Sequence, residues 1–165
     1  MRMISVIFLF GCVVSSPILS VSQALANACN NAGISISGGY LKETPPHAPV
    51  SAGYLTIHNF GKNDIWLTAI DAPFAKKAAV HEIKMSDGVM AMGEKEGGVR
   101  VPTGEMVTLA PGGLHLMFMG LKEPLTKGDE HIVTLSFSSC GTTDILLPVA
   151  AETMSEHRQD THKHH

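Results

Sequence analysis

Short stretches of β-favouring residues, each closed by a turn, follow one another along most of this chain. Between Gly33 and Val149 the apolar residues gather in short runs, several of them alternating with polar residues, and Gly, Pro, Asn or Asp separate the runs. No segment keeps the 3.6-residue period of an amphipathic helix. Short strands at this spacing are typical of an antiparallel sandwich or barrel. The chain therefore predicts one all-β domain of about nine short strands, at 34–36, 54–59, 65–70, 79–85, 89–92, 106–109, 114–119, 132–137 and 145–149.

The first 26 residues have the three parts of a secretory signal peptide. Arg2 supplies a basic start, an apolar stretch follows over 4–19, and a small-x-small cleavage site lies at 24–26. We expect cleavage before Asn27 and export to the periplasm, which leaves the β domain at 27–150. Residues 9–12 loosely match a lipoprotein box, so anchoring through Cys12 is the less favoured alternative.

The last residues, 151–165, contain too few apolar side chains to bury a core and predict a flexible tail. Several imidazoles on such a segment would bind Cu(II) or Zn(II) weakly. The tail is therefore a possible secondary metal site, with Met154, His157, His162, His164 and His165 as its candidate ligands.

Met and His are both frequent in this chain, whereas aromatic residues are scarce. There are nine Met and nine His, and both side chains are neutral metal ligands near pH 7. The net charge of -3 gives no electrostatic reason to expect a nucleic-acid partner. No HExxH, GxSxG or P-loop motif indicates a small-molecule substrate.

Cys29 and Cys140 are the two cysteines that would remain after removal of the leader. An even pair in an oxidising compartment predicts a disulfide. Copper ligation by two thiolates is the alternative, and it is less favoured because neither Cys lies in a CxxC motif or beside a His.

The densest group of chemically interesting residues lies at 80–92, around the hairpin signal Asp87-Gly88. Folding the chain there brings His81 and Met92 opposite each other to within about one residue. A second group lies at 112–120, where His115 and Met117 share one face of a strand because side chains alternate with period two. Met119 is next on that face.

Bringing the two groups together predicts a site of two imidazoles and two thioethers. Its ligands would be His81, Met92, His115 and Met117. Thioether sulfur suits the soft ion Cu(I), and Met survives in an oxidising compartment where free thiol pairs are lost to disulfides.

These motifs resemble the periplasmic copper chaperones of the PCuAC type, whose signature is a His, ten residues, a Met, about twenty-one residues and then His-x-Met. Here ten residues separate His81 from Met92, and twenty-two separate Met92 from His115. The extra residue can fall near the turn at 94–98, and it leaves Met90 as an alternative to Met92. The similarity runs from Gly33 to Val149 and includes 52–57, 80–82, 87–90, 111–117 and 119–121.

The resemblance implies a cupredoxin-like β-sandwich that is not an enzyme. It would bind Cu(I) and deliver it to a copper-acceptor protein, either an oxidase copper subunit or another copper chaperone. Some members of this family carry a His/Met-rich C-terminal extension that also takes Cu(II), and the tail at 151–165 looks similar.

Other interpretations of the same residues remain open. The favoured one for a Met on a strand, here Met85, Met90, Met106 or Met119, is core packing or a surface position. A cupredoxin-type electron carrier would need a thiolate beside two His, and no His follows Cys140 closely. A copper storage or resistance protein is another alternative. A metal hydrolase would need a carboxylate beside the metal, and Glu82 should point to the opposite face from His81.

Overall fold

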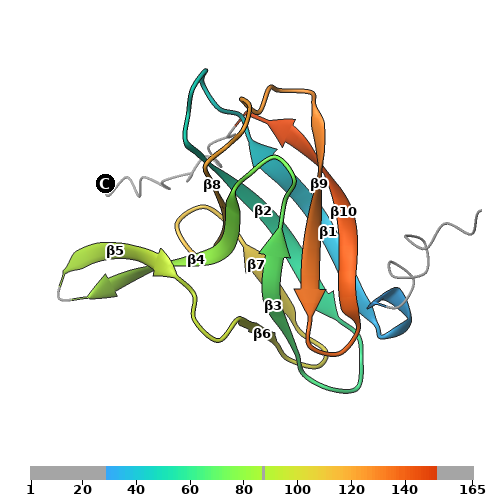
Figure 1. The fold of residues 1–165 in the computed structure, drawn as a ribbon. Coiled ribbons are helices and arrows are strands. Elements are labelled where there is room, and N and C mark those ends of the chain that lie inside the picture. Colours follow the sequence, from blue (N-terminus) through green and yellow to red (C-terminus); the bar gives the residue numbers. More distant parts are fainter. Residues whose placement is uncertain (1–28, 87, 152–165) are drawn as a thin grey trace, which may run out of the picture.

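The computed structural model describes residues 29–86 and 88–151, and it confirms the prediction of a β-sandwich (Figure 1). The predicted signal peptide, Cys12 and the candidate metal ligands of the tail lie outside the described residues. Ten strands form the domain: β1 (Ile34–Lys42), β2 (Val50–Asn59), β3 (Ile65–Asp71), β4 (Lys77–Ser86), β5 (Val89–Glu94), β6 (Val99–Val101), β7 (Met106–Leu109), β8 (His115–Met119), β9 (Glu130–Phe137) and β10 (Gly141–Ala150).

The strands follow the hydrogen-bonded order β5-β4-β8-β2-β1-β10-β9-β3-β6, with β7 also paired to β2. This path folds over on itself, so that β3, β9 and β10 lie in front of β1 and β2 in Figure 1. The expected antiparallel pairing holds except between β1 and β10, which run parallel through Leu41↔Val149 and Lys42↔Ala150.

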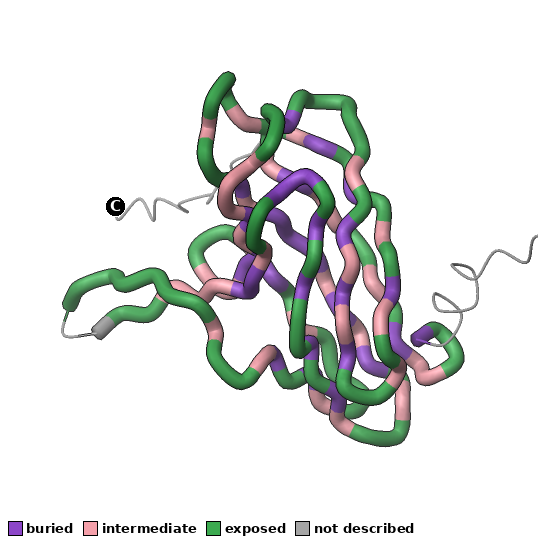
Figure 2. The backbone as a smooth tube through the Cα atoms, viewed as in Figure 1, coloured by how far each residue is buried: buried purple, intermediate pink, exposed green. Residues whose placement is uncertain are grey.

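The core lies between the two layers, and alternate residues of the strands supply it. Phe118, Leu116, Ile57, Leu135 and Val133 are among the fully buried side chains. Figure 2 shows buried positions along the strands of both layers, whereas the segment formed by β5 and the outer half of β4 is exposed along nearly all of its length. The domain is therefore a packed body with one arm that lies outside the core.

Strand β2 divides its pairing between two consecutive strands. Its first half pairs with β8 and its second half with β7. The turn that joins β7 to β8 closes through a hydrogen bond from the Ala110 N–H to the Leu114 carbonyl. Gly112 has a φ of 83° there, a left-handed conformation that glycine adopts without strain. The turn places His115 at the first position of β8.

Strand β4 changes partner at His81. Residues 77–81 pair with β8, and residues 81–86 pair with β5. Beyond His81 the two strands leave the body as a hairpin, which projects to the left in Figure 1. We call β5 together with residues 82–86 of β4 the arm.

Strand β6 and the side chain of Asn59 hold together one end of the sandwich, and neither feature was predicted from the sequence. Strand β6 is only Val-Arg-Val, flanked by glycines and a proline, and is too short to stand out in the sequence. The fully buried Asn59 joins it to β2, because its amide donates to the carbonyls of Asn63 and Val101 and its Oδ1 accepts from the Gly61 N–H.

The structure contains the predicted disulfide between Cys29 and Cys140, whose Cα atoms are 5.0 Å apart. Cys29 is buried in the core, and the bridge encloses a sequence separation of 111 residues. With both sulfurs bonded to each other, neither cysteine is a thiolate ligand in this form of the protein.

Candidate metal centre

The four predicted ligands lie on one face of the sheet, where the arm leaves the body. His81 and His115 are directly paired across β4 and β8, and their ring centroids are 6.0 Å apart. Met117 is two residues further along β8 and therefore points to the same face as His115. Met92 comes from β5, opposite Ile83.

The expected register of the hairpin was wrong by two residues. Ser86 pairs with Val89, so only two residues separate the strands, and Met92 pairs with Ile83 while His81 pairs with Glu94. An even shift keeps the side chains on the same face. His81 and Met92 are consequently diagonal neighbours and not direct partners.

The imidazole of His115 is held in a defined orientation. The side chain is buried, and its Nδ1 lies 3.0 Å from the Gly113 carbonyl. Because a carbonyl only accepts hydrogen bonds, Nδ1 carries the proton in this contact. Nε2 then has its lone pair free for a metal, which is the second-sphere arrangement that metal-binding histidines usually have.

His81 has no such partner. Both of its ring nitrogens are buried, and neither makes a hydrogen bond among the described residues. Burial lowers the pKa of His81 below its ordinary value, and the neighbouring His115 lowers it further, with Glu94 acting in the opposite sense. A neutral imidazole with buried, unpaired nitrogens is costly unless something else binds them, and a metal ion would do so.

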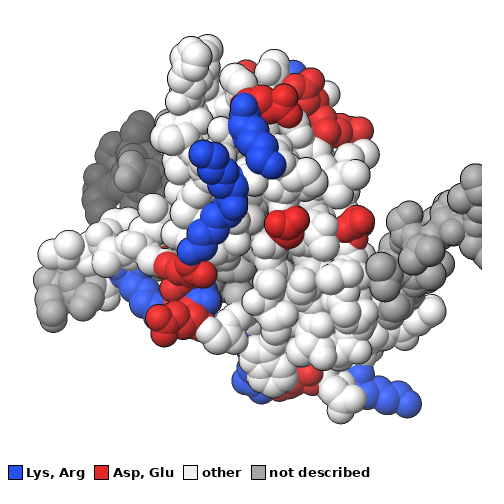
Figure 3. Space-filling model, in the orientation of Figure 1, with Lys and Arg blue, Asp and Glu red and all other residues white. Residues whose placement is uncertain are grey.

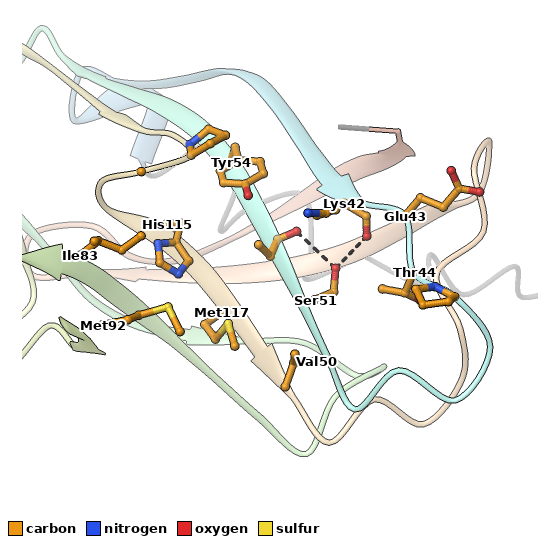
Figure 4. A pocket seen from close by; sticks show the side chains of 14 residues that line it. Lys42, Glu43, Thr44, Val50, Ser51, Tyr54, Ile83, Met92, His115 and Met117 are labelled. Carbon is orange, nitrogen blue, oxygen red and sulfur yellow. Dashed lines mark hydrogen bonds between the residues drawn. The ribbon is translucent and has the colours of Figure 1, made fainter. Parts of the chain in front are cut away.

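Met92, His115 and Met117 line a pocket of about 350 Å³. Figure 4 shows the side chains of Met92 and Met117 beside each other and next to the His115 ring. The walls are mostly apolar and include Ile83 and Tyr54, which the sequence analysis did not single out. The signal for Ile83 was present, since a two-residue loop at 87–88 sets it opposite Met92.

The nearest carboxylate in the strand pairing is Glu94, which the sequence analysis overlooked. It is paired directly with His81, but its Oε2 lies 2.6 Å from the Lys77 ammonium. The hydrogen bond and charge of Lys77 hold the pKa of Glu94 below its ordinary value. Glu82 is bound to Lys84 and Lys95.

Figure 3 shows acidic and basic side chains interspersed on the visible face.

The remaining candidate methionines divide into two groups. Met119 lies on the same face as Met117, but it pairs with Val50 and Lys77 and does not line the pocket. Met85, Met90 and Met106 are strongly exposed. Of the expected packing or surface roles, these three have the surface one, because the arm carries two of them away from the core and β7 turns the third to solvent.

The described residues hold no cluster of three or more His, Cys, Asp or Glu that could bind a metal. In the same part of the chain there is no helix with the length and apolarity needed to cross a bilayer.

A family model described as "Putative lipoprotein LpqE-like" matches residues 34–149 of this chain. The chain belongs to this LpqE-like family. It is also 31% identical over 141 residues to "Putative lipoprotein Lxx21020" of Leifsonia xyli subsp. xyli (strain CTCB07), covering 86% of this chain and 81% of that protein. Both names contain the words "putative lipoprotein".

Solved structures confirm the resemblance to PCuAC domains at the level of the fold. The apo PCuAC domain from PmoF1 has a TM-score of 0.61 and 24% identity, covering 72% of this chain and 94% of that domain. The copper-bound PCuAC domain from PmoF2 has a TM-score of 0.61 and 19% identity, covering 72% and 93%. Solution structures of DR1885 from Deinococcus radiodurans are similar too, the Cu(I) form with a TM-score of 0.55 and 24% identity, covering 77% and 86%.

Proposed function

We propose that this protein is an exported copper carrier that holds one Cu(I) ion with His81, Met92, His115 and Met117 and passes it to an acceptor protein. One observation carries the proposal. His115, with an oriented Nε2, lines one pocket together with the thioethers of Met92 and Met117. His81 does not line that pocket, but it is paired with His115 on the same face of the sheet, and its buried nitrogens have no partner among the described residues.

The donor set favours Cu(I) over harder ions. Thioethers bind soft ions, whereas Mg²⁺ and Ca²⁺ require oxygen ligands. The nearby Glu94 is engaged by Lys77, which leaves the four neutral side chains as the donors. Neutral ligands leave the ion's single positive charge uncompensated, so the site should hold copper less tightly than thiolates would. That suits a protein that must release its metal.

The position of the site suits transfer between proteins. Met92 is more than half exposed, whereas His115 is buried. A partner can therefore replace the outer sulfur first and the inner ligands afterwards. As acceptors we propose an oxidase copper subunit or another copper chaperone, and we propose that the tail residues take Cu(II).

X-ray absorption on the Cu(I)-loaded chain tests the ligand set. We expect scattering from two nitrogen and two sulfur neighbours, with one sulfur lost in Met117→Leu. Met119→Leu is the matched control, because this thioether is two residues away on the same strand and outside the pocket. A first shell without sulfur would contradict the proposal.

A cupredoxin-type electron carrier is less well supported, because the disulfide occupies the only described cysteines. A storage protein would bind the same ion but retain it. Incubation of the Cu(I) form with an apo acceptor distinguishes the two functions. Transfer within minutes is expected for a carrier, and retention would favour storage.

We further propose that export ends in cleavage before Asn27. Mass spectrometry of the protein isolated from cells tests this point. A chain that begins at Asn27 is expected. A lipid-modified chain that begins at Cys12 would contradict this proposal, and it would fit the lipoprotein names of the relatives.

A further inference from the structure

We propose that Met85 and Met90, at the outer end of the arm, form a second Cu(I) site. It exchanges the ion through Met92 with the inner site, which is the proposed centre of His81, Met92, His115 and Met117. The exchange part of this inference rests on the proposed function, since it requires copper at the inner site. Binding at the outer pair does not depend on it.

The strand pairing places the two thioethers together. Met85 and Met90 are direct partners across β4 and β5. Directly paired side chains in antiparallel strands start from Cβ atoms about 5 Å apart. Because a Met side chain is long and unbranched, both sulfurs can reach one ion between them.

Their exposure indicates that these side chains do not serve packing. Met85, Met90 and Met92 are 71%, 65% and 55% exposed. Burying a side chain of this size stabilises a fold through the hydrophobic effect, and these three side chains largely lack that contribution. The arm thus presents soft sulfur ligands to solvent at positions where Leu or a polar residue would serve a surface strand equally well.

The outer pair is aligned with the inner site. Met85, Ile83 and His81 alternate along β4, and Met90 and Met92 alternate along β5, so all five side chains lie on one face. One two-residue step along a strand covers about 7 Å. Met92 lies one such step from Met90, and it also lines the inner pocket.

This arrangement allows copper to move by exchange of one ligand at a time. A Cu(I) ion held by Met85 and Met90 would gain the Met92 sulfur before it releases an outer one. It would then gain His115 and Met117. The ion remains Cu(I) and every ligand is neutral, so no electron or proton has to be supplied. The outer pair offers copper two ligands and the inner site offers four, so the ion should move from the outer pair to the inner site.

Methyl NMR on the chain labelled at the methionine methyl carbons tests the proposal during titration with Cu(I) under reducing conditions. The first equivalent should shift the Met92 and Met117 methyls. The second should shift the Met85 and Met90 methyls together. In Met85→Leu, the Cu(I) concentration needed to shift Met90 should rise at least about tenfold, because chelation is lost.

Met106→Leu is the matched control, since Met106 is exposed to a similar degree but lies on β7, outside the arm. It should leave the response of Met85 and Met90 unchanged. If Met90 still shifts at the same Cu(I) concentration in Met85→Leu, the thioethers bind independently and the paired site is refuted. If Met92 and Met117 do not shift with the first equivalent, the proposed function fails, whatever the outer pair does.

Discussion

The two imidazoles of the candidate centre are prepared for a metal in different ways. His115 is oriented by the Gly113 carbonyl, which fixes the proton on Nδ1 and leaves Nε2 available. Burial lowers the pKa of His81, which favours its neutral form. Neither feature is visible in a spacing motif, because both depend on the turn at 110–114 and on the pairing of β4 with β8.

Replacing His115 with Ala should weaken Cu(I) binding by more than about 100-fold, since loss of a second-sphere partner alone often costs 10–100-fold. Competition with a Cu(I) chelator measures the affinity. His58→Ala is the control, because His58 lies on β2 beside Phe60 and away from the pocket. Equal affinities of the two variants would remove His115 from the site.

Asn59→Ala should lower the free energy of unfolding by roughly 2–4 kcal/mol, because it leaves buried backbone groups of the β2–β3 turn and β6 without partners. Chemical denaturation measures the change. Asn63→Ala removes an exposed amide but keeps the carbonyl that Asn59 uses, and should stay within about 0.5 kcal/mol of the parent chain. Similar losses in both variants would contradict this role for Asn59.

At the scale of the elements, strand existence was easier to predict than strand pairing. Nine of the ten strands coincide with short apolar runs between turn residues, and only the three-residue β6 does not. The predicted ligands share a face, as expected, because an even register error preserves the side of the sheet. The direct partner of Met92 was misjudged because the loop length was left open, and the split of β2 between β7 and β8 depends on contacts distant in sequence.

The contacts of Asp64 with Arg100 and Thr103 should make the stability of the fold depend on pH. The Thr103 N–H and the Arg100 guanidinium hold the pKa of Asp64 below its ordinary value. A carboxylate with a lowered folded pKa stabilises the fold above its unfolded pKa, and this stabilisation is lost as pH falls through the folded pKa. Asp64→Asn should therefore be less stable than the parent chain at neutral pH.

The difference in stability between the parent chain and Asp64→Asn should shrink between about pH 5 and pH 2, because the parent carboxylate becomes protonated in this range. Thermal melts of both chains across this range measure it. Asp71→Asn, which changes an exposed carboxylate at the last position of β3, serves as the control. A stability difference between parent and Asp64→Asn that is independent of pH would show that charge at Asp64 is irrelevant.

For the whole molecule, the first and last strands are held together twice. β1 and β10 pair in parallel, and Cys29 is bonded to Cys140 at the other end of these strands. The cysteine pairing was predictable from number and compartment alone. The parallel pairing was not, because it depends on where two strands at opposite ends of the chain meet.

Removing the disulfide in Cys29→Ala/Cys140→Ala should destabilise the fold by about 2–5 kcal/mol, because the bridge closes a loop of 111 residues. Urea denaturation measures this cost, and the reduced parent chain should show the same loss. Copper affinity should be nearly unchanged at temperatures where the variant is folded, since neither cysteine lines the pocket. An unaltered unfolding midpoint would show that β1–β10 pairing suffices.

The partner change of β4 at His81 has a mechanical consequence. His115 and Met117 belong to the packed body, Met92 belongs to the arm, and His81 marks the junction between them. An ion held by all four would act as a clasp across that junction, so the loaded and empty proteins would differ in the stiffness of their arm. A receiving protein would then distinguish the loaded form by the stiffness of its arm. By bending the arm it would move Met92 away from the other ligands and weaken the binding of the metal.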